Sequence, residues 1–260
     1  MCLSEKPRKA PYVASNIENR NRMKIINCKT ILLILISTFA YSQNTQKKMN
    51  KNVPNSVEIV DNHLDQFFDK NADIKVFDEI ESETIHRDIY FIKATDDRPY
   101  HILLSCGMSA LPMTIPDDIE SSEFVEIMIL LPKEWNLEYE SFSNEKNYWP
   151  IRIMKEIMMS PHENKTWFGY GHTFGHEEGE EFAEGIGFNS IMLAYSMELS
   201  EDFTQIELEN GKVVDIYTLI PLYKEELEFK KKNGLSALLK RFDKFGIEEI
   251  VKIGRKNVCK

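Results

Sequence analysis

The sequence contains little cysteine, and its cysteines are far apart. They are Cys2, Cys28, Cys106 and Cys259, and no two of them form a CxxC pair. Zinc ribbons and thioredoxin-like redox sites need such closely spaced pairs, so the spacing excludes both classes. We interpret Cys106 and Cys259 as ordinary buried or terminal thiols rather than as a disulfide pair.

The motifs of several common enzyme classes are also missing. The chain has no GxSxG nucleophile elbow, no P-loop, and no GxGxxG motif between a strand and a helix. Acidic pairs such as Asp117-Asp118 and Glu225-Glu226 are expected on solvated surfaces, because catalysis also needs a pocket that desolvates its carboxyl groups. The sequence therefore predicts a protein that is not an enzyme, with no catalytic residue, no metal and no cofactor.

Positive charge is scarce outside the N-terminal region. The formal net charge is −10, yet residues 1–42 hold seven Lys and Arg against two Asp and Glu. The remaining residues hold 25 basic and 40 acidic side chains. Such a negative body repels a phosphate backbone and attracts a basic partner, which argues against nucleic acid and for a basic protein.

The apolar run at residues 31–40 is too short to cross a membrane, which takes about 20 residues. Lys24 and Lys29 precede the run, and Ala40-Tyr41-Ser42 resembles a cleavage site before Gln43. Residues 23–42 are therefore a predicted signal peptide for export, preceded by an upstream or leader segment, residues 1–22. Translation from Met49 is the alternative, and it would leave the protein in the cytoplasm.

Hydrophobic periodicity predicts an α+β domain over residues 56–260, after a polar leader at 43–55. Helix-like spacing of apolar residues begins at Ser56. Asn210-Gly211 predicts a hairpin, and Asn233-Gly234 a helix end between two C-terminal helices. The expected strands are 74–80, 89–94, 101–106, 124–131, 166–173, 190–195, 203–208 and 213–220. We expect a single domain with a mixed, mostly antiparallel sheet and packed helices.

Two prolines and a loop complete the local predictions. Pro150 suits the first turn of a helix over residues 151–159, and Pro221 suits the end of the last strand. The Gly, Pro and Asp content of residues 107–118 indicates a loop.

His172 and His176 are four residues apart and are followed by Glu177, the elements of a metal-dependent hydrolase site on a helix. Glycines at 169, 171, 175 and 179 make a helix unfavourable here, and HExxH is absent. The favoured interpretation is a strand end followed by an acidic loop, with the hydrolase as the alternative function.

Several short motifs occur in a fixed order along the chain. They are Cys106-Gly107-Met108-Ser109 with Pro112-Met113, Ile129 to Pro132 with Trp135, Tyr148-Trp149-Pro150, Thr166-Trp167 with Gly171-His172-Thr173, Leu219 to Tyr223 with Glu225 to Leu227, Gly234 with Leu238-Leu239, and Arg255 to Asn257. In this order they resemble the suppressor of fused family in its single-domain bacterial form, over roughly residues 57–257.

The resemblance implies a binding protein rather than an enzyme. Similar animal proteins hold a short strand-forming peptide of a transcription factor. Similar single-domain bacterial proteins are commonly assigned as immunity proteins that neutralise a toxin domain. An exported binding protein of unknown partner is a further alternative. In animal members an acidic residue precedes the motif histidine, whereas this chain has Gly171 there.

The motif residues divide into two expected groups. Those expected to contact a partner are Met108, Ser109 and Met113 on the loop after a central strand, together with His172 and Glu226. Those expected to be structural are Gly107, Trp149, Pro150, Trp167, Gly171, Pro221, Tyr223, Gly234 and Arg255.

Overall fold

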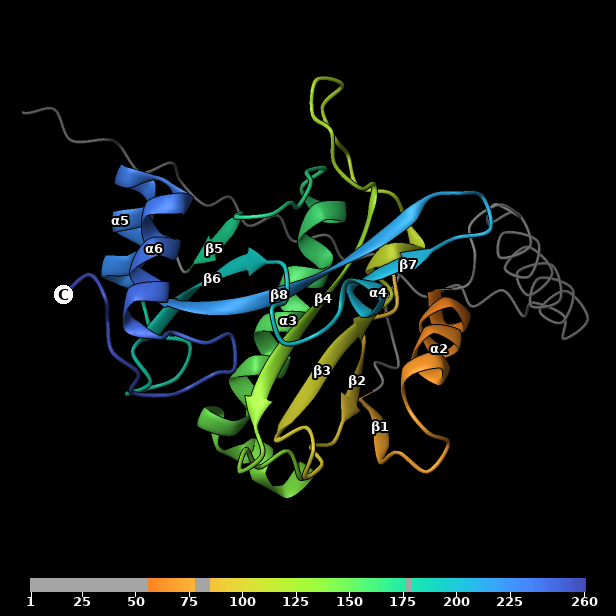
Figure 1. The fold of residues 1–260 in the computed structure, drawn as a ribbon, viewed down its shortest axis with the longest axis horizontal. Coiled ribbons are helices and arrows are strands. Elements are labelled where there is room, and N and C mark those ends of the chain that lie inside the picture. Colours follow the sequence, from red (N-terminus) through yellow and green to blue (C-terminus); the bar gives the residue numbers. More distant parts are fainter. Residues whose placement is uncertain (1–55, 78–84, 176–178) are drawn as a thin grey trace, which may run out of the picture. The chain divides into compact units, whose positions relative to one another are not determined.

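In the residues that the structure describes, 56–77, 85–175 and 179–260, eight strands form one mixed sheet (Figure 1). The structure is a computed structural model. The sheet order is β1-β2-β3-β4-β8-β6-β5, with β7 also paired to β8, and only the β4–β8 pair is parallel. The strands are β1 (Ile74–Phe77), β2 (Asp88–Ile92), β3 (Tyr100–Cys106), β4 (Phe124–Pro132), β5 (Thr173–Gly175), β6 (Phe188–Ala194), β7 (Gln205–Glu207) and β8 (Val213–Tyr223).

Helices cover both faces of this sheet. They are α2 (Ser56–Phe67), α3 (Glu145–Glu163), α4 (Glu201–Thr204), α5 (Lys224–Asn233) and α6 (Leu235–Phe245), with short 3-10 helices η1 (Met108–Ala110) and η2 (Tyr139–Ser143). Val125 and Ile127 of β4 pack in the core on the α3 side, whereas Phe124 and Met128 pack in the core that includes α2. Because alternate residues of a strand point to opposite faces, both faces are buried, which explains the continuous apolar runs of β3 and β4.

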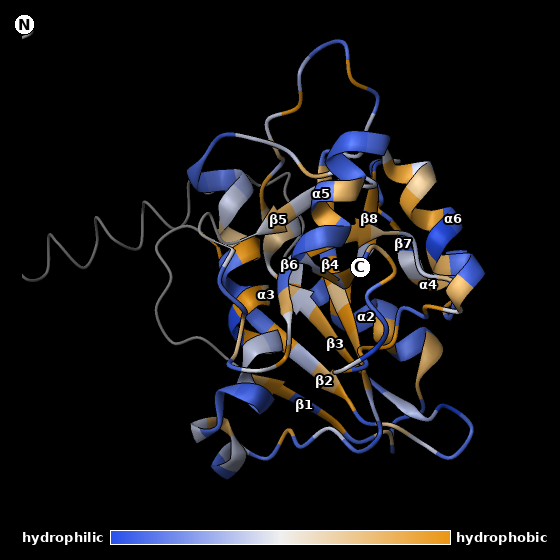
Figure 2. Cartoon of the chain, turned by 90° about the vertical axis from the view of Figure 1, so that its left-hand side faces the viewer, coloured by the Kyte–Doolittle hydropathy of each residue, from blue (hydrophilic) through white to orange (hydrophobic). Residues whose placement is uncertain are grey.

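A third core lies at the other end of the sheet, where α5 and α6 pack. Leu238 and Phe242 of α6 meet Met192 of β6 and Leu222 of β8 there. Figure 2 shows hydrophobic residues concentrated in the strands and hydrophilic residues prominent on the helices. The α+β prediction with a mixed, mostly antiparallel sheet is therefore confirmed.

Several local predictions hold. α2 begins at Ser56, and Gly211, with a φ of 77°, makes the turn between β7 and β8. Gly234, with a φ of 86°, follows the last residue of α5 and donates its N–H to the Lys230 carbonyl oxygen at 2.8 Å. A positive φ of this kind is where glycine is favoured over other residues.

Both proline predictions are wrong. α3 begins at Glu145, because the Asn144 side chain caps its first turn, and this puts Pro150 inside the helix. Pro221 lies within β8 rather than at its end. Among the described strands only β6 pairs with β8 at Pro221, since the pairing of β8 with β4 runs from Val214 to Thr218. A residue without an N–H is tolerated where a strand pairs on one side only.

Two predicted strands are shorter than expected, and the predicted loop contains η1. Of residues 166–173 only Thr173 belongs to a strand, and β5 continues from it to Gly175. Phe203 and Thr204 lie in α4, whose first turn is capped by Ser200, so β7 starts at Gln205. None of the helices in the described part of the chain is long and apolar enough to cross a bilayer. The signal-peptide prediction at 23–42, and the flanking segments 1–22 and 43–55, fall outside the described residues.

Candidate partner-binding site

β5 is an edge strand that pairs with β6 alone within the described residues. Thr173 lies opposite Met192, and Gly175 lies opposite Ser190. Thr173 and Phe174 are half-buried, and Gly175 is exposed. Because an edge strand has backbone groups that no neighbouring strand uses, β5 offers a place where an extended peptide can pair.

The segment before β5 folds into a tight turn that positions His172. The Gly171 N–H donates to the Leu193 carbonyl oxygen at 2.8 Å, and the Leu193 N–H donates to that of His172 at 2.9 Å. Gly171 has a φ of 80°, and a Cβ there would lie 2.6 Å from Leu235 Cδ2. Any other residue would be strained at this positive φ, and its Cβ would require the Leu235 side chain at the start of α6 to move, so glycine fits the local packing.

His172 lines a cleft of about 350 Å³ between this turn and α5. Its ring lies 4.4 Å from the Trp167 ring, centroid to centroid. Burial lowers the pKa of His172, and the nearby Lys230 ammonium lowers it further. A backbone hydrogen bond with Trp167 acts in the opposite direction and raises that pKa by less than burial lowers it. Burial also lowers the pKa of Lys230, as does Lys231. The cleft thus combines an imidazole and an ammonium with aromatic walls, a set suited to recognising polar groups of a partner. Its lining is Thr166, Trp167, Phe168, Gly171, His172, Thr173, Phe174 and Lys230.

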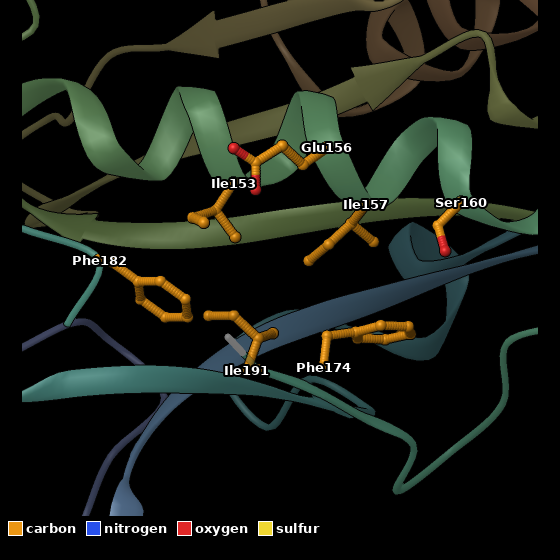
Figure 3. Close-up of a pocket in the computed structure, with 8 residues that line it drawn as sticks. Ile153, Glu156, Ile157, Ser160, Phe174, Phe182 and Ile191 are labelled. Carbon is orange, nitrogen blue, oxygen red and sulfur yellow. The ribbon is translucent and has the colours of Figure 1, made fainter. Parts of the chain in front are cut away.

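An apolar pocket of about 150 Å³ lies beside the same strand, against α3 (Figure 3). Ile153 and Ile157 of α3 face Phe174 of β5 and Ile191 of β6 across it. Phe174 borders both this pocket and the His172 cleft. A peptide paired with β5 would point alternate side chains to opposite faces of the sheet, so it has two differently lined cavities within reach.

The motif at the end of β3 surrounds a buried carboxylate, Glu126. Glu126 is fully buried and accepts hydrogen bonds from the N–H groups of Gly107 and Ser109, both at 3.0 Å. The hydroxyl groups of Ser105 and Ser109 donate to it at 2.5 and 2.7 Å. Gly107 has a φ of 131°, and a Cβ there would lie 1.9 Å from the His86 carbonyl oxygen. The structural role expected for Gly107 therefore has a clear physical basis.

Met108, Ser109 and Met113 follow the central strand β3, as expected, but all three are buried. Their exposed fractions are 1%, 2% and 6%. The Met108 carbonyl oxygen lies 3.2 Å from His162 Nε2 of α3, and Met113 Sδ accepts the Phe168 N–H at 3.3 Å. These side chains are held inside because η1 turns the chain back onto the core and Glu126 fixes that turn. Their role in binding stays a prediction.

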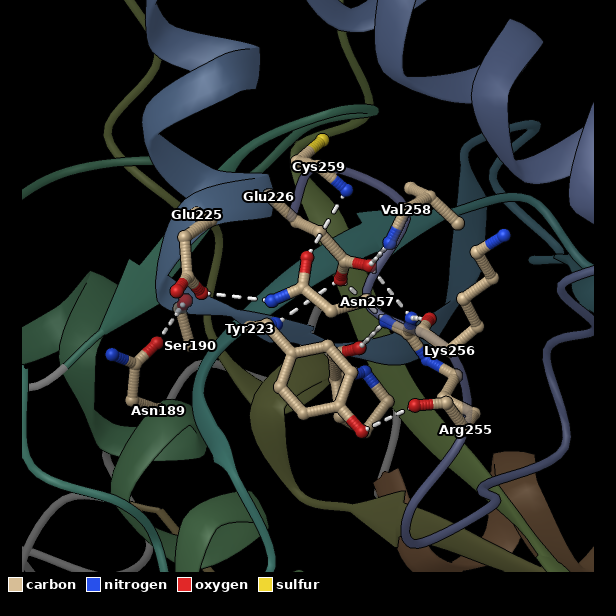
Figure 4. A network of polar contacts seen from close by, with 11 residues as sticks. Asn189, Ser190, Tyr223, Glu225, Glu226, Arg255, Lys256, Asn257, Val258 and Cys259 are labelled. Atoms are coloured by element: carbon tan, nitrogen blue, oxygen red, sulfur yellow. Dashed lines mark hydrogen bonds and ion pairs between the residues drawn. The ribbon is translucent and has the colours of Figure 1, made fainter.

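Glu226 is also buried rather than presented to a partner. It pairs through both oxygens with Arg255, as Figure 4 shows. It accepts the Tyr223 N–H at 3.1 Å, which caps the first turn of α5, and the Val258 N–H at 3.1 Å. Tyr223 in turn donates its hydroxyl to the Arg255 carbonyl oxygen at 2.7 Å. These contacts fasten the C-terminal segment to the start of α5.

The two motif tryptophans differ in burial. Trp149 is fully buried and stacks on Phe182, with ring centroids 5.6 Å apart, as expected for a core residue. Trp167 is half-buried at the cleft. The sequence did not single out Lys230, because a lysine in the last turn of a helix is a common feature with no further signal.

The hydrolase alternative lacks structural support. No group of three or more His, Cys, Asp or Glu is placed to hold a metal ion in the part of the chain that the structure describes. His176 and Glu177 lie outside that part, so the alternative stays a prediction.

A model of the family described as suppressor of fused protein (SUFU) matches residues 83–256. The chain belongs to this family. A protein of Ureaplasma parvum serovar 3 is 28% identical to it over 180 residues, which are 68% of this chain and 81% of that protein. The resemblance noted from the ordered motifs is therefore confirmed.

Solved structures of the suppressor of fused family share the fold. A homologue from Neisseria gonorrhoeae FA 1090 aligns with a TM-score of 0.56 at 18% identity, covering 77% of this chain and 95% of that chain. The Sufu–Fu complex aligns with a TM-score of 0.56 at 13% identity, covering 79% of this chain and 92% of that chain. The second structure contains a family member bound to another protein.

Proposed function

We propose that this chain is a protein-binding module that holds an extended segment of a partner along β5, and that it acts as an immunity protein neutralising a toxin domain. The observation that carries the binding role is the edge of β5, with the His172 cleft and the α3 pocket beside it. Backbone pairing would supply affinity, and the two cavities would select side chains.

Two further observations support a protein partner. A solved structure with the same fold is a complex with another protein. Residues 56–260 hold 22 Lys and Arg against 40 Asp and Glu, a charge that attracts a basic toxin domain and speeds association. The immunity role rests on the resemblance to single-domain bacterial members.

The test begins by identifying any neighbouring gene that encodes a toxin domain and co-expressing its product with this chain. We expect rescue of growth and a complex that co-purifies. His172→Ala combined with Lys230→Ala should weaken the complex at least about tenfold, or about 1.4 kcal/mol. Lys232→Ala is the matched control, because Lys232 is exposed on the same helix and does not line the cleft.

The outcomes separate the two parts of the proposal. A complex without rescue would remove the immunity role and leave the binding module. A complex that the double variant does not weaken would move the contact away from β5. Absence of any complex with the neighbouring gene product would refute the immunity proposal.

A further inference from the structure

Three large side chains near the end of β6 are exposed. Met197 exposes 90% of its surface, Tyr195 exposes 50%, and Tyr170 exposes 44%. The rings of Tyr170 and Tyr195 stack at 4.9 Å with an interplanar angle of 14°. Tyr195 also lies 5.4 Å from the ring of Tyr217, a buried residue of β8. We call Tyr170, Tyr195 and Met197 the β6-end surface.

The loop that carries Met197 is held in place by a buried carboxylate. Glu249, which is 6% exposed, accepts the Ser196 hydroxyl at 2.5 Å and the Met197 N–H at 2.9 Å. It also accepts the Glu198 N–H at 3.2 Å. An exposed methionine held in a fixed loop loses little backbone freedom when a partner binds, which favours affinity.

The stretch of sequence that carries this surface is acidic. Residues 166–211 contain ten Asp and Glu and no Lys or Arg. Of these, Glu198, Glu201 and Asp202 are exposed and follow Met197 directly, at the start of α4. Tyrosine faces attract cations by about 0.5–1 kcal/mol at exposed positions, and methionine packs adaptably against long side chains.

We propose that the β6-end surface binds an arginine- or lysine-bearing segment of a protein partner, with the cations on the tyrosine faces and near the three carboxylates. The proposal rests on the proposed binding function and names a second contact of the same partner. The turn at Gly171 and His172 links the two contacts, because Leu193 of β6 holds it while Tyr170 stacks beside it.

The test is an NMR titration of the whole protein with a blocked peptide that carries two arginines. A peptide with citrulline in place of each arginine keeps the shape and removes the charge. We expect the Met197 methyl and Tyr195 ring signals to shift with the arginine peptide and not with the citrulline peptide. Tyr195→Ser and Met197→Ser should each weaken binding at least about threefold. Tyr139→Ser is the control and should leave binding unchanged. Tyr139 is also an exposed tyrosine, at 81%, but it lies on η2 and does not belong to the β6-end surface.

A charge-matched pair of triple variants separates local recognition from general attraction to an acidic protein. Glu198→Gln with Glu201→Gln and Asp202→Asn should weaken peptide binding more than Glu58→Gln with Asp65→Asn and Asp69→Asn does. The proposal would be overturned if the two triple variants lost the same amount of peptide affinity. It would also be overturned if the citrulline peptide shifted the Met197 and Tyr195 signals as much as the arginine peptide does. If the neighbouring toxin binds and Tyr195→Ser and Met197→Ser leave its affinity unchanged, the β6-end surface fails while the proposed function stands. If no toxin binds but the arginine peptide shifts the Met197 signal, the immunity role fails while the β6-end surface stands.

Discussion

Arg255 and Glu226 form a two-pronged ion pair, with nitrogen–oxygen distances of 2.7 and 2.6 Å. The Arg255 side chain is 7% exposed and that of Glu226 is fully buried. Arg255 also donates to the Pro221 carbonyl oxygen at 2.9 Å, and its guanidinium lies over the Tyr223 ring at 4.9 Å. The pair therefore joins the end of β8, the start of α5 and the C-terminal segment.

Glu226→Gln should destabilise the protein by about 3–5 kcal/mol, because it leaves the Arg255 charge buried without its partner. Urea denaturation measures the loss. Glu225→Gln is the neighbouring control, since Glu225 pairs with the exposed Lys260, and it should cost at most about 1 kcal/mol. Similar losses in the two variants would contradict the assignment of Glu226 as the buried partner.

Gly107→Ala should cost more stability than Gly211→Ala. Both glycines have a positive φ, so each alanine pays about 1–2 kcal/mol of backbone strain. A Cβ at Gly107 also meets the His86 carbonyl oxygen, whereas nothing lies within 4 Å of a Cβ at Gly211. We expect an additional 1–3 kcal/mol or so at Gly107. Thermal unfolding of the two variants gives the difference, and equal shifts in melting temperature would show that the contact with His86 is absent.

His101 should stay neutral at a pH where exposed histidines are protonated. The ring is 4% exposed, Nδ1 accepts the Ala94 N–H at 2.9 Å, and Nε2 lies 3.0 Å from the Lys133 carbonyl oxygen. A second ring proton would face the Ala94 N–H. Burial lowers the pKa of His101, against the hydrogen bond to Lys133. Nitrogen-15 NMR should show the neutral ring at a pH where exposed histidines titrate.

The sign of the linked stability change follows. The unfolded chain takes up this proton near pH 6.5 and the folded chain only at lower pH, so the free energy of unfolding falls as the pH drops below about 6.5. The slope from one such histidine is at most about 1.4 kcal/mol per pH unit. His101→Gln should reduce the slope below about pH 6.5. An unchanged slope would mean that His101 is protonated in the folded state.

The sheet and its main helices were predictable because their signals are local. The apolar runs of β3 and β4, the spacing in α2 and the turn at Gly211 each depend on residues close in sequence. The predictions at Pro150 and Pro221 failed because they depend on features outside the local sequence pattern. The start of α3 is set by the cap at Asn144, and β8 accepts Pro221 because its pairing with β4 has already ended.

The site was less predictable, because it depends on contacts between distant segments. His172 was identified from its motif, but Lys230 comes from a helix nearly 60 residues further on. Met113 was expected to contact a partner because it lies on the loop after a central strand, yet it is buried and its sulfur accepts a hydrogen bond from Phe168, 55 residues away. Sequence alone does not show which loops turn back onto the core.

Glu249→Ala should release the loop that carries Met197. Glu249 accepts three hydrogen bonds from Ser196, Met197 and Glu198, and the Leu199 N–H donates to the Ser196 hydroxyl at 3.1 Å. Removing the carboxylate leaves the Met197 N–H without its acceptor and leaves the Glu198 N–H only the Ser196 hydroxyl, at 3.3 Å. The Met197 amide should therefore exchange with solvent at least about tenfold faster, equivalent to about 1.4 kcal/mol, and the Glu198 amide should accelerate less. Hydrogen exchange followed by NMR measures this at Met197 and Glu198. Glu248→Ala is the control, because Glu248 is the exposed neighbour of Glu249 in the sequence and its substitution removes the same charge. If exchange rises equally throughout the sheet, the variant has lowered global stability and the loop has no separate anchor. If it rises in the loop alone, peptide binding at the β6-end surface should weaken with it, because the partner must then restore the order that Glu249 supplies.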